Sequence, residues 1–171
     1  MSTRTLRACA IVLFVTTFAT MSRAQVTVLR ASLDGGQEVP PSGSLASGEL
    51  AMSIDQSTNL FNLAVFVKGI ALTDLTGSHI HLAPAGVNGP IIVDLDASQW
   101  FESGGAIGRT ILEGSFPAAN VAALLSEGTY INVHTTQFPA GEIRGQIVPE
   151  PSTVALLFSG LGVLALRRRN S

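Results

Sequence analysis

Short apolar or alternating segments recur between residues 25 and 148, separated by Gly, Pro, Asn, Asp and Ser. Alternation with a period of two is typical of β-strands with one buried face, and the intervening residue types are typical of turns. About eight short strands in a segment of this size predict an all-β domain, built as an antiparallel sandwich. The predicted strands are VTVLRASL, GELAMSID, LFNLAVFVKGI, SHIHLAP, PIIVDL, IGRTILEGSF, TYINVHTT and GEIRGQIV.

One segment, FPAANVAALLSEG, has helical rather than strand spacing. Pro117 stands where a first helical turn tolerates proline, Val121 and Leu124 fall on one face, and Gly128 is a stop signal. The pattern predicts one short helix near 117–127, which caps one end of the sandwich.

The first 24 residues have the organisation of a targeting segment. Arg4 and Arg7 precede an uncharged run from Ala8 to Met21, and a small residue, Ala24, ends the segment. This order predicts a secretory signal peptide of residues 1–24, cleaved after Ala24. The alternative is an uncleaved anchor, although the run is shorter than the ~20 residues that span a bilayer as a helix.

Cys9 is the only cysteine and lies inside this predicted signal peptide. The mature chain would then contain no cysteine. Disulfides, thiolate nucleophiles and sulfur metal ligands are excluded together, so an ordinary apolar core must stabilise the exported domain.

The last 23 residues, 149–171, have three parts in order: a Pro-Glu-Pro motif, an apolar stretch over 154–166, and an arginine cluster. The motif is Pro149, Glu150 and Pro151, and the cluster is Arg167, Arg168 and Arg169. Arginines after an apolar segment stay in the cytoplasm, which leaves the preceding domain outside. The tail resembles the PEP-CTERM sorting signal of bacterial exported proteins. The resemblance implies a precursor tethered in the inner membrane, cleavage by an exosortase-type protease, and release to the envelope or an extracellular matrix; a plain C-terminal anchor is the alternative.

The charge of the central segment differs from that of the whole chain. The full sequence has a net charge of −2, whereas residues 25–148 contain 4 basic and 11 acidic side chains, which gives −7. Such a segment has no basic patch for phosphates, so nucleic acid is excluded as a partner class.

The chain has three histidines, and strand parity gives all of them the same orientation. In SHIHLAP the apolar Ile80 faces the core, so His79 and His81 point to the other side. In TYINVHTT the same reasoning turns Val133 inward and His134 outward. If the two strands are neighbours, a cross-strand spacing of ~5 Å brings three imidazoles within reach of one zinc or copper ion. The alternative is three ordinary surface histidines on strands.

The two histidine segments, GSHIHLAPAGVNGPIIVDL and EGTYINVHTTQFPAGEIRGQI, resemble the signature segments of the CHRD domain, named for chordin and found in bacterial exported proteins. Besides the histidines, the matching positions are Gly86, Gly89, Pro90, Tyr130, Asn132, Thr135, Pro139, Gly141, Glu142, Ile143, Arg144 and Gly145. The resemblance covers about residues 26–148 and implies a Greek-key sandwich of the immunoglobulin-like or superoxide-dismutase-like kind, with an extracellular role and no assigned reaction. A looser likeness to copper-zinc superoxide dismutases lacks the further histidines which that chemistry requires.

Two other pairs of residues have structural and functional interpretations. Glu142 and Arg144 would share a strand face, where an ion pair or a loop clamp is favoured over catalysis. Trp100 and Phe101 would form either a plug under a loop or an exposed aromatic contact for sugars, and the plug is favoured.

Two functions follow from the sequence. The first is an exported, non-enzymatic module of residues 25–148 that binds an extracellular polysaccharide or an envelope protein. The second is a mononuclear copper- or zinc-binding domain, or a metalloenzyme, that uses His79, His81 and His134.

Overall fold

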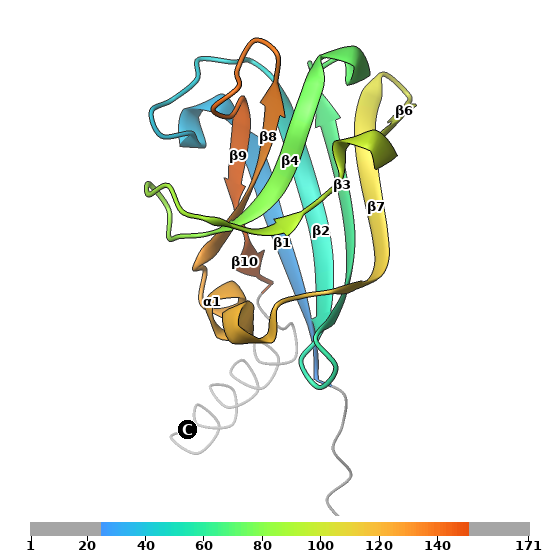
Figure 1. The fold of residues 1–171 in the computed structure, drawn as a ribbon, viewed down its shortest axis with the longest axis vertical. Coiled ribbons are helices and arrows are strands. Elements are labelled where there is room, and N and C mark those ends of the chain that lie inside the picture. Colours follow the sequence, from blue (N-terminus) through green and yellow to red (C-terminus); the bar gives the residue numbers. More distant parts are fainter. Residues whose placement is uncertain (1–24, 151–171) are drawn as a thin grey trace, which may run out of the picture.

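The structure is a computed structural model, and it describes residues 25–150. All described strands join one curled antiparallel sheet, in the order β5-β4-β8-β9-β1-β2-β3-β7-β6, with β10 paired to β1 (Figure 1). The strands are β1 (Val26–Asp34), β2 (Ser47–Asp55), β3 (Leu60–Lys68), β4 (Leu75–Leu82), β5 (Ile91–Asp94), β6 (Phe101–Ser103), β7 (Ala106–Ser115), β8 (Thr129–Thr135), β9 (Ile143–Gln146) and β10 (Val148–Pro149).

The prediction of an antiparallel all-β protein with one short helix is confirmed. The helix α1 (Val121–Leu125) follows a 3-10 turn, Ala118–Asn120, and places Leu124 in the core. Its end is marked by Glu127, which has a left-handed φ of 61°, and by a bond from the Gly128 N–H to the Ala123 carbonyl. The Greek-key sandwich stays a prediction, because hydrogen bonds connect all described strands in a single sheet.

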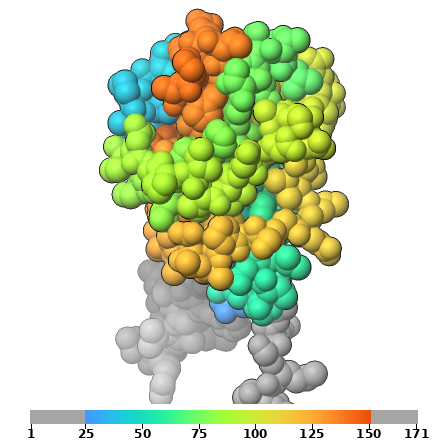
Figure 2. Space-filling view, in the orientation of Figure 1, coloured from blue at the N-terminus to red at the C-terminus, as the bar shows by residue number. Residues whose placement is uncertain are grey.

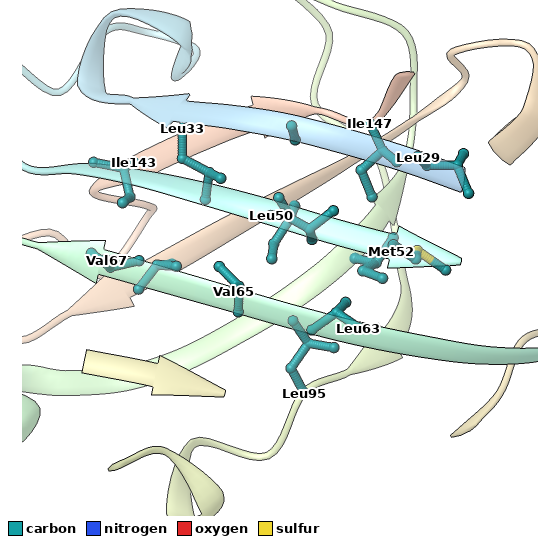
Figure 3. Close-up of a cluster of buried hydrophobic side chains, with 14 of the residues drawn as sticks. Leu29, Leu33, Leu50, Met52, Leu63, Val65, Val67, Leu95, Ile143 and Ile147 are labelled. Atoms are coloured by element: carbon teal, nitrogen blue, oxygen red, sulfur yellow. The ribbon is translucent and has the colours of Figure 1, made fainter. Parts of the chain in front are cut away.

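Apolar residues alternate with polar ones along the strands, so aliphatic side chains fill the concave side of the sheet. In β1, β2 and β3 alternate residues are buried, as the strand pattern predicts. Figure 3 shows Leu33, Leu50 and Val65 of these strands facing a common core. The opposite wall comes from β4, β8 and β9, through Ile80, Ile131, Val133 and Ile143. This packing fixes which side of β4 and β8 faces the core and leaves their polar residues on the other side.

Long loops cross the outer side of β4, β8 and β9. In Figure 2 the yellow-green residues after β4 lie across the front of the molecule. Trp100 lies at the end of this loop and is buried in the core. Its indole Nε1 donates to the Ser78 hydroxyl at 2.9 Å. In residues 25–150, no helix is long and apolar enough to cross a membrane.

Candidate metal centre

The three histidines meet on the paired strands β4 and β8. In the antiparallel register His79 lies opposite Asn132, His81 opposite Tyr130, and His134 opposite Gly77. Each histidine offers one ring nitrogen, and these three atoms lie within 4.8 Å of one another. The condition set by the sequence, that His134 occupies a neighbouring strand on the same face, is therefore met; the role of the histidines as ligands stays a prediction.

Although the three histidines point away from the core, their side chains are not fully exposed to solvent. Only 8% of the His81 surface is exposed, and His79 and His134 are half-buried. The covering loops follow β4, over residues 83–90, and β8, over residues 136–142.

Two backbone carbonyls from these loops determine which ring nitrogen of His81 and of His134 carries the proton. The Nδ1 of His81 lies 2.9 Å from the Gly89 oxygen, and the Nδ1 of His134 lies 3.1 Å from the Pro139 oxygen. A carbonyl oxygen only accepts hydrogen bonds, so both Nδ1 atoms carry the proton and both Nε2 lone pairs are free. Metal-binding histidines are commonly oriented by carbonyl contacts of this kind.

Three of the other ring nitrogens of the cluster lack partners. The Nδ1 of His79 and the Nε2 atoms of His81 and His134 are buried without a hydrogen bond. Burial lowers the pKa of His79, against an opposing effect of the Asp94 carboxylate, and burial also lowers the pKa of His134. Neutral imidazoles with unpartnered buried nitrogens are the state in which histidine binds a metal.

Gly77 leaves space beside the cluster. A Cβ atom at this position would lie 3.0 Å from Cε1 of His79 and 3.8 Å from Cδ2 of His134. A side chain at position 77 would therefore press on the His79 ring and contact the His134 ring.

The separation of the nitrogens fits one ion after a small contraction. For three atoms within 4.8 Å of one another, the equidistant point lies at most about 2.8 Å from each, whereas zinc–imidazole bonds are about 2.0–2.1 Å. Movement of each ring by less than about 1 Å would produce a three-nitrogen site with one position left for water or another ligand.

Tyr130 stacks on the His81 ring, and Arg144 stacks on Tyr130. The rings of His81 and Tyr130 are parallel within 6° with centroids 4.8 Å apart, and Cζ of Arg144 lies 3.4 Å from the Tyr130 ring centroid. Cation–π attraction of this kind is strengthened when water is excluded, and only 1% of Arg144 is exposed.

Arg144 also holds the loop that provides the Gly89 carbonyl. Its guanidinium donates to the carbonyl oxygens of Pro84 and Val87, at 3.1 and 2.9 Å, and to Oδ1 of Asn88, at 3.2 Å. These three contacts connect β9 to the loop over residues 83–90.

Glu142 bonds elsewhere rather than to Arg144. Its carboxylate accepts from the Ser44 hydroxyl at 2.7 Å and from the Thr135 hydroxyl at 2.6 Å. This arrangement ties β8 to the loop before β2.

Glu38, a buried acid that interacts electrostatically with Arg144, was not predicted from the sequence. Only 6% of Glu38 is exposed, and its Oε1 has no partner. Burial raises its pKa from the ordinary 4.5 to about 7, against the opposing charge of Arg144. No local motif marks this residue, because its environment comes from Gly141 and Asn132, about 100 positions away.

Several predicted positions lie outside the described residues. These are the cleavage position Ala24, the last motif residue Pro151, and the cluster Arg167, Arg168 and Arg169. Pro90 precedes β5, and its carbonyl accepts from the Leu82 N–H at 3.0 Å.

The fold and the cluster define an antiparallel β-domain with three histidines gathered under two loops. The chain belongs to the CHRD domain family: the family model described as CHRD domain matches residues 29–147. A second model, described as the PEP-CTERM protein-sorting motif, matches residues 148–169. Both predicted resemblances are confirmed, and the tail identifies an exported protein whose membrane-anchored precursor is processed by an exosortase. None of the curated proteins matches the chain.

Proposed function

We propose that this exported domain binds one copper or zinc ion through His79, His81 and His134. The observation that supports the proposal is the convergence of the three ring nitrogens within 4.8 Å, with two of the rings oriented by carbonyl oxygens. Three neutral imidazoles and one open position suit either metal. When bound, the ion would act as a Lewis acid or, as copper, as a one-electron centre.

The proposed chain organisation is a signal peptide of residues 1–24, a mature domain of residues 25–148 and a sorting tail of residues 149–171. After processing, the domain would act in the cell envelope or an extracellular matrix. The fold would be that of a Greek-key sandwich whose two walls are continuous at one edge.

A test uses the chain from Gln25 to Glu150, purified without a tag, loaded with copper or zinc and dialysed. Elemental analysis should give about one ion per chain for the wild type and less than about 0.2 for His81→Ala and His134→Ala. Gln137→Ala is the matched control, because this exposed residue lies in the covering loop but offers no ligand. Equal metal content in all four proteins would contradict the proposal.

The second proposed function is a non-enzymatic binding module for an extracellular polysaccharide or an envelope protein. It is supported by an exposed aromatic pair on the far side of the sheet, where the Phe66 and Phe101 rings pack edge to face at 6.1 Å. Beside Phe66 a groove is lined by Glu49, Asp34 and Lys68, side chains that can bond hydroxyl groups. Retention of the protein on envelope polysaccharide, lost in Phe66→Ala and kept in Leu112→Ala, would support this role.

A further inference from the structure

The sorting motif begins inside the folded sheet. The pairs of β10 with β1 are Leu29 with Pro149 and Arg30 with Val148. The Glu150 N–H then donates to the Val28 carbonyl at 2.9 Å, so the pairing continues into the motif. Two of the three motif residues therefore lie against β1: Pro149 is paired with Leu29 in the register, and Glu150 is hydrogen-bonded to Val28 (Figure 1).

A side-chain contact and a buried neighbour reinforce this pairing. Arg30 and Glu150 form an ion pair of 3.8 Å across the two strands, with both side chains largely exposed. Ile147, directly before β10, is fully buried in the core. The motif thus starts two residues after a core position, with no linker between them.

A protease that reads a short motif needs access to its backbone and side chains. Peptides in such enzymes and in other recognition domains are commonly held as extended strands through main-chain hydrogen bonds. In this protein the same groups of the segment 148–150 already bond to β1, and the glutamate of the motif is engaged by Arg30. The two binding modes exclude each other.

We propose that the folded domain masks its own sorting motif, and that β10 must separate from β1 before the exosortase can cleave the tail. Processing is then coupled to the local stability of the end of the sheet. Strand ends with few contacts open far more readily than the core, so masking slows cleavage rather than preventing it.

An engineered disulfide tests this proposal in the full-length precursor. Arg30 and Val148 are directly opposite in an antiparallel pair, where Cα atoms are about 4.5–5.5 Å apart, within the range a disulfide spans. Arg30→Cys with Val148→Cys would hold β10 on β1 and leave the motif sequence intact. The chain contributes no competing thiol apart from Cys9.

Membranes that contain the processing protease are incubated with the oxidised precursor, and loss of a C-terminal epitope is followed on immunoblots. The oxidised variant should be processed at least about tenfold more slowly than wild type, and dithiothreitol should restore the rate. Arg30→Cys alone controls for loss of the ion pair. Thiol alkylation measures the fraction locked.

A second lock separates masking from general stiffening of the fold. Ala51 and Ala64 are opposite each other in β2 and β3, so Ala51→Cys with Ala64→Cys staples the sheet away from the motif. This variant should be processed at the wild-type rate whether oxidised or reduced. Wild-type rates for the fully locked β1–β10 variant, or equal slowing by both locks, would overturn the proposal. None of these outcomes depends on metal binding.

Discussion

The buried carboxyl group of Glu38 should make the stability of the domain depend on pH in a predictable direction. Its pKa is raised to about 7, chiefly by burial, while the neighbouring Arg144 opposes the shift. Glu38→Gln keeps the size and shape of the protonated side chain and removes the titration. The difference between wild type and variant therefore isolates this one group.

The magnitude follows from the two pKa values. A carboxyl whose pKa is raised on folding binds its proton more tightly in the native state, so its contribution to stability is present at low pH and is lost as the pH rises through about 7. The gap between 4.5 and about 7 corresponds to about 3.4 kcal/mol at most, at 1.36 kcal/mol per unit. Integrating the pH dependence of the unfolding free energy between pH 5 and pH 8 gives a loss of about 2.5 kcal/mol.

Urea denaturation of the metal-free chain at pH 5 and pH 8 measures this effect. The unfolding free energy of wild type, relative to Glu38→Gln, should fall by about 2.5 kcal/mol over that interval. The lowered pKa values of His79 and His134 act in the opposite direction, because their neutral folded forms lose stability below pH 6.5, but they are common to both proteins and cancel. Parallel pH profiles for the two proteins would refute the assignment of a buried, protonated Glu38.

Three further predictions concern the loops and the core. Gly89→Ala should lower the free energy of unfolding, measured by urea denaturation, by about 3 kcal/mol or more, because a Cβ there would lie 2.0 Å from the Leu82 carbonyl oxygen of β4. Gly86→Ala should lower it by only about 1 kcal/mol, the cost of a side chain at a φ of 76°. Equal losses for the two variants would contradict this prediction. Arg144→Lys should weaken the proposed metal site by about 10–100-fold in competitive titration. The compact lysine ammonium lacks the planar fork whose two terminal nitrogens bond Pro84, Val87 and Asn88, and unchanged affinity would count against the positioning role of Arg144. Ser78→Ala should lower the unfolding free energy by about 1–3 kcal/mol, because the buried Trp100 indole loses its acceptor; a change below about 0.5 kcal/mol would contradict the hydrogen bond.

Strand positions could be predicted from the sequence wherever one face is buried over many residues. The segment VTVLRASL becomes β1 with only one further residue, because its alternation is regular and its apolar face meets the core. GEIRGQIV was predicted as one strand but gives β9 and β10, starting only at Ile143. The later start has a backbone cause: Gly141 has a φ of 135°, in the region that favours glycine, so the backbone turns before the strand begins. Strand β6 has three residues, between Trp100 and the turn at Gly104 and Gly105, which are too few for a recognisable alternation of polar and apolar positions.

The orientation of the histidines was predictable, but their burial was not. Parity within β4 and β8 is a local property, and the apolar neighbours Ile80 and Val133 fix it without knowledge of the rest of the chain. The pairing of β4 with β8 joins residues that are 47 to 60 positions apart, so the sequence could state it only as a condition. The loop over residues 83–90, which provides the Gly89 carbonyl, depends in turn on Arg144, whose contacts lie 56–60 positions away. The features that turn three outward histidines into a candidate metal centre are therefore long-range contacts, for which single-strand patterns carry no signal.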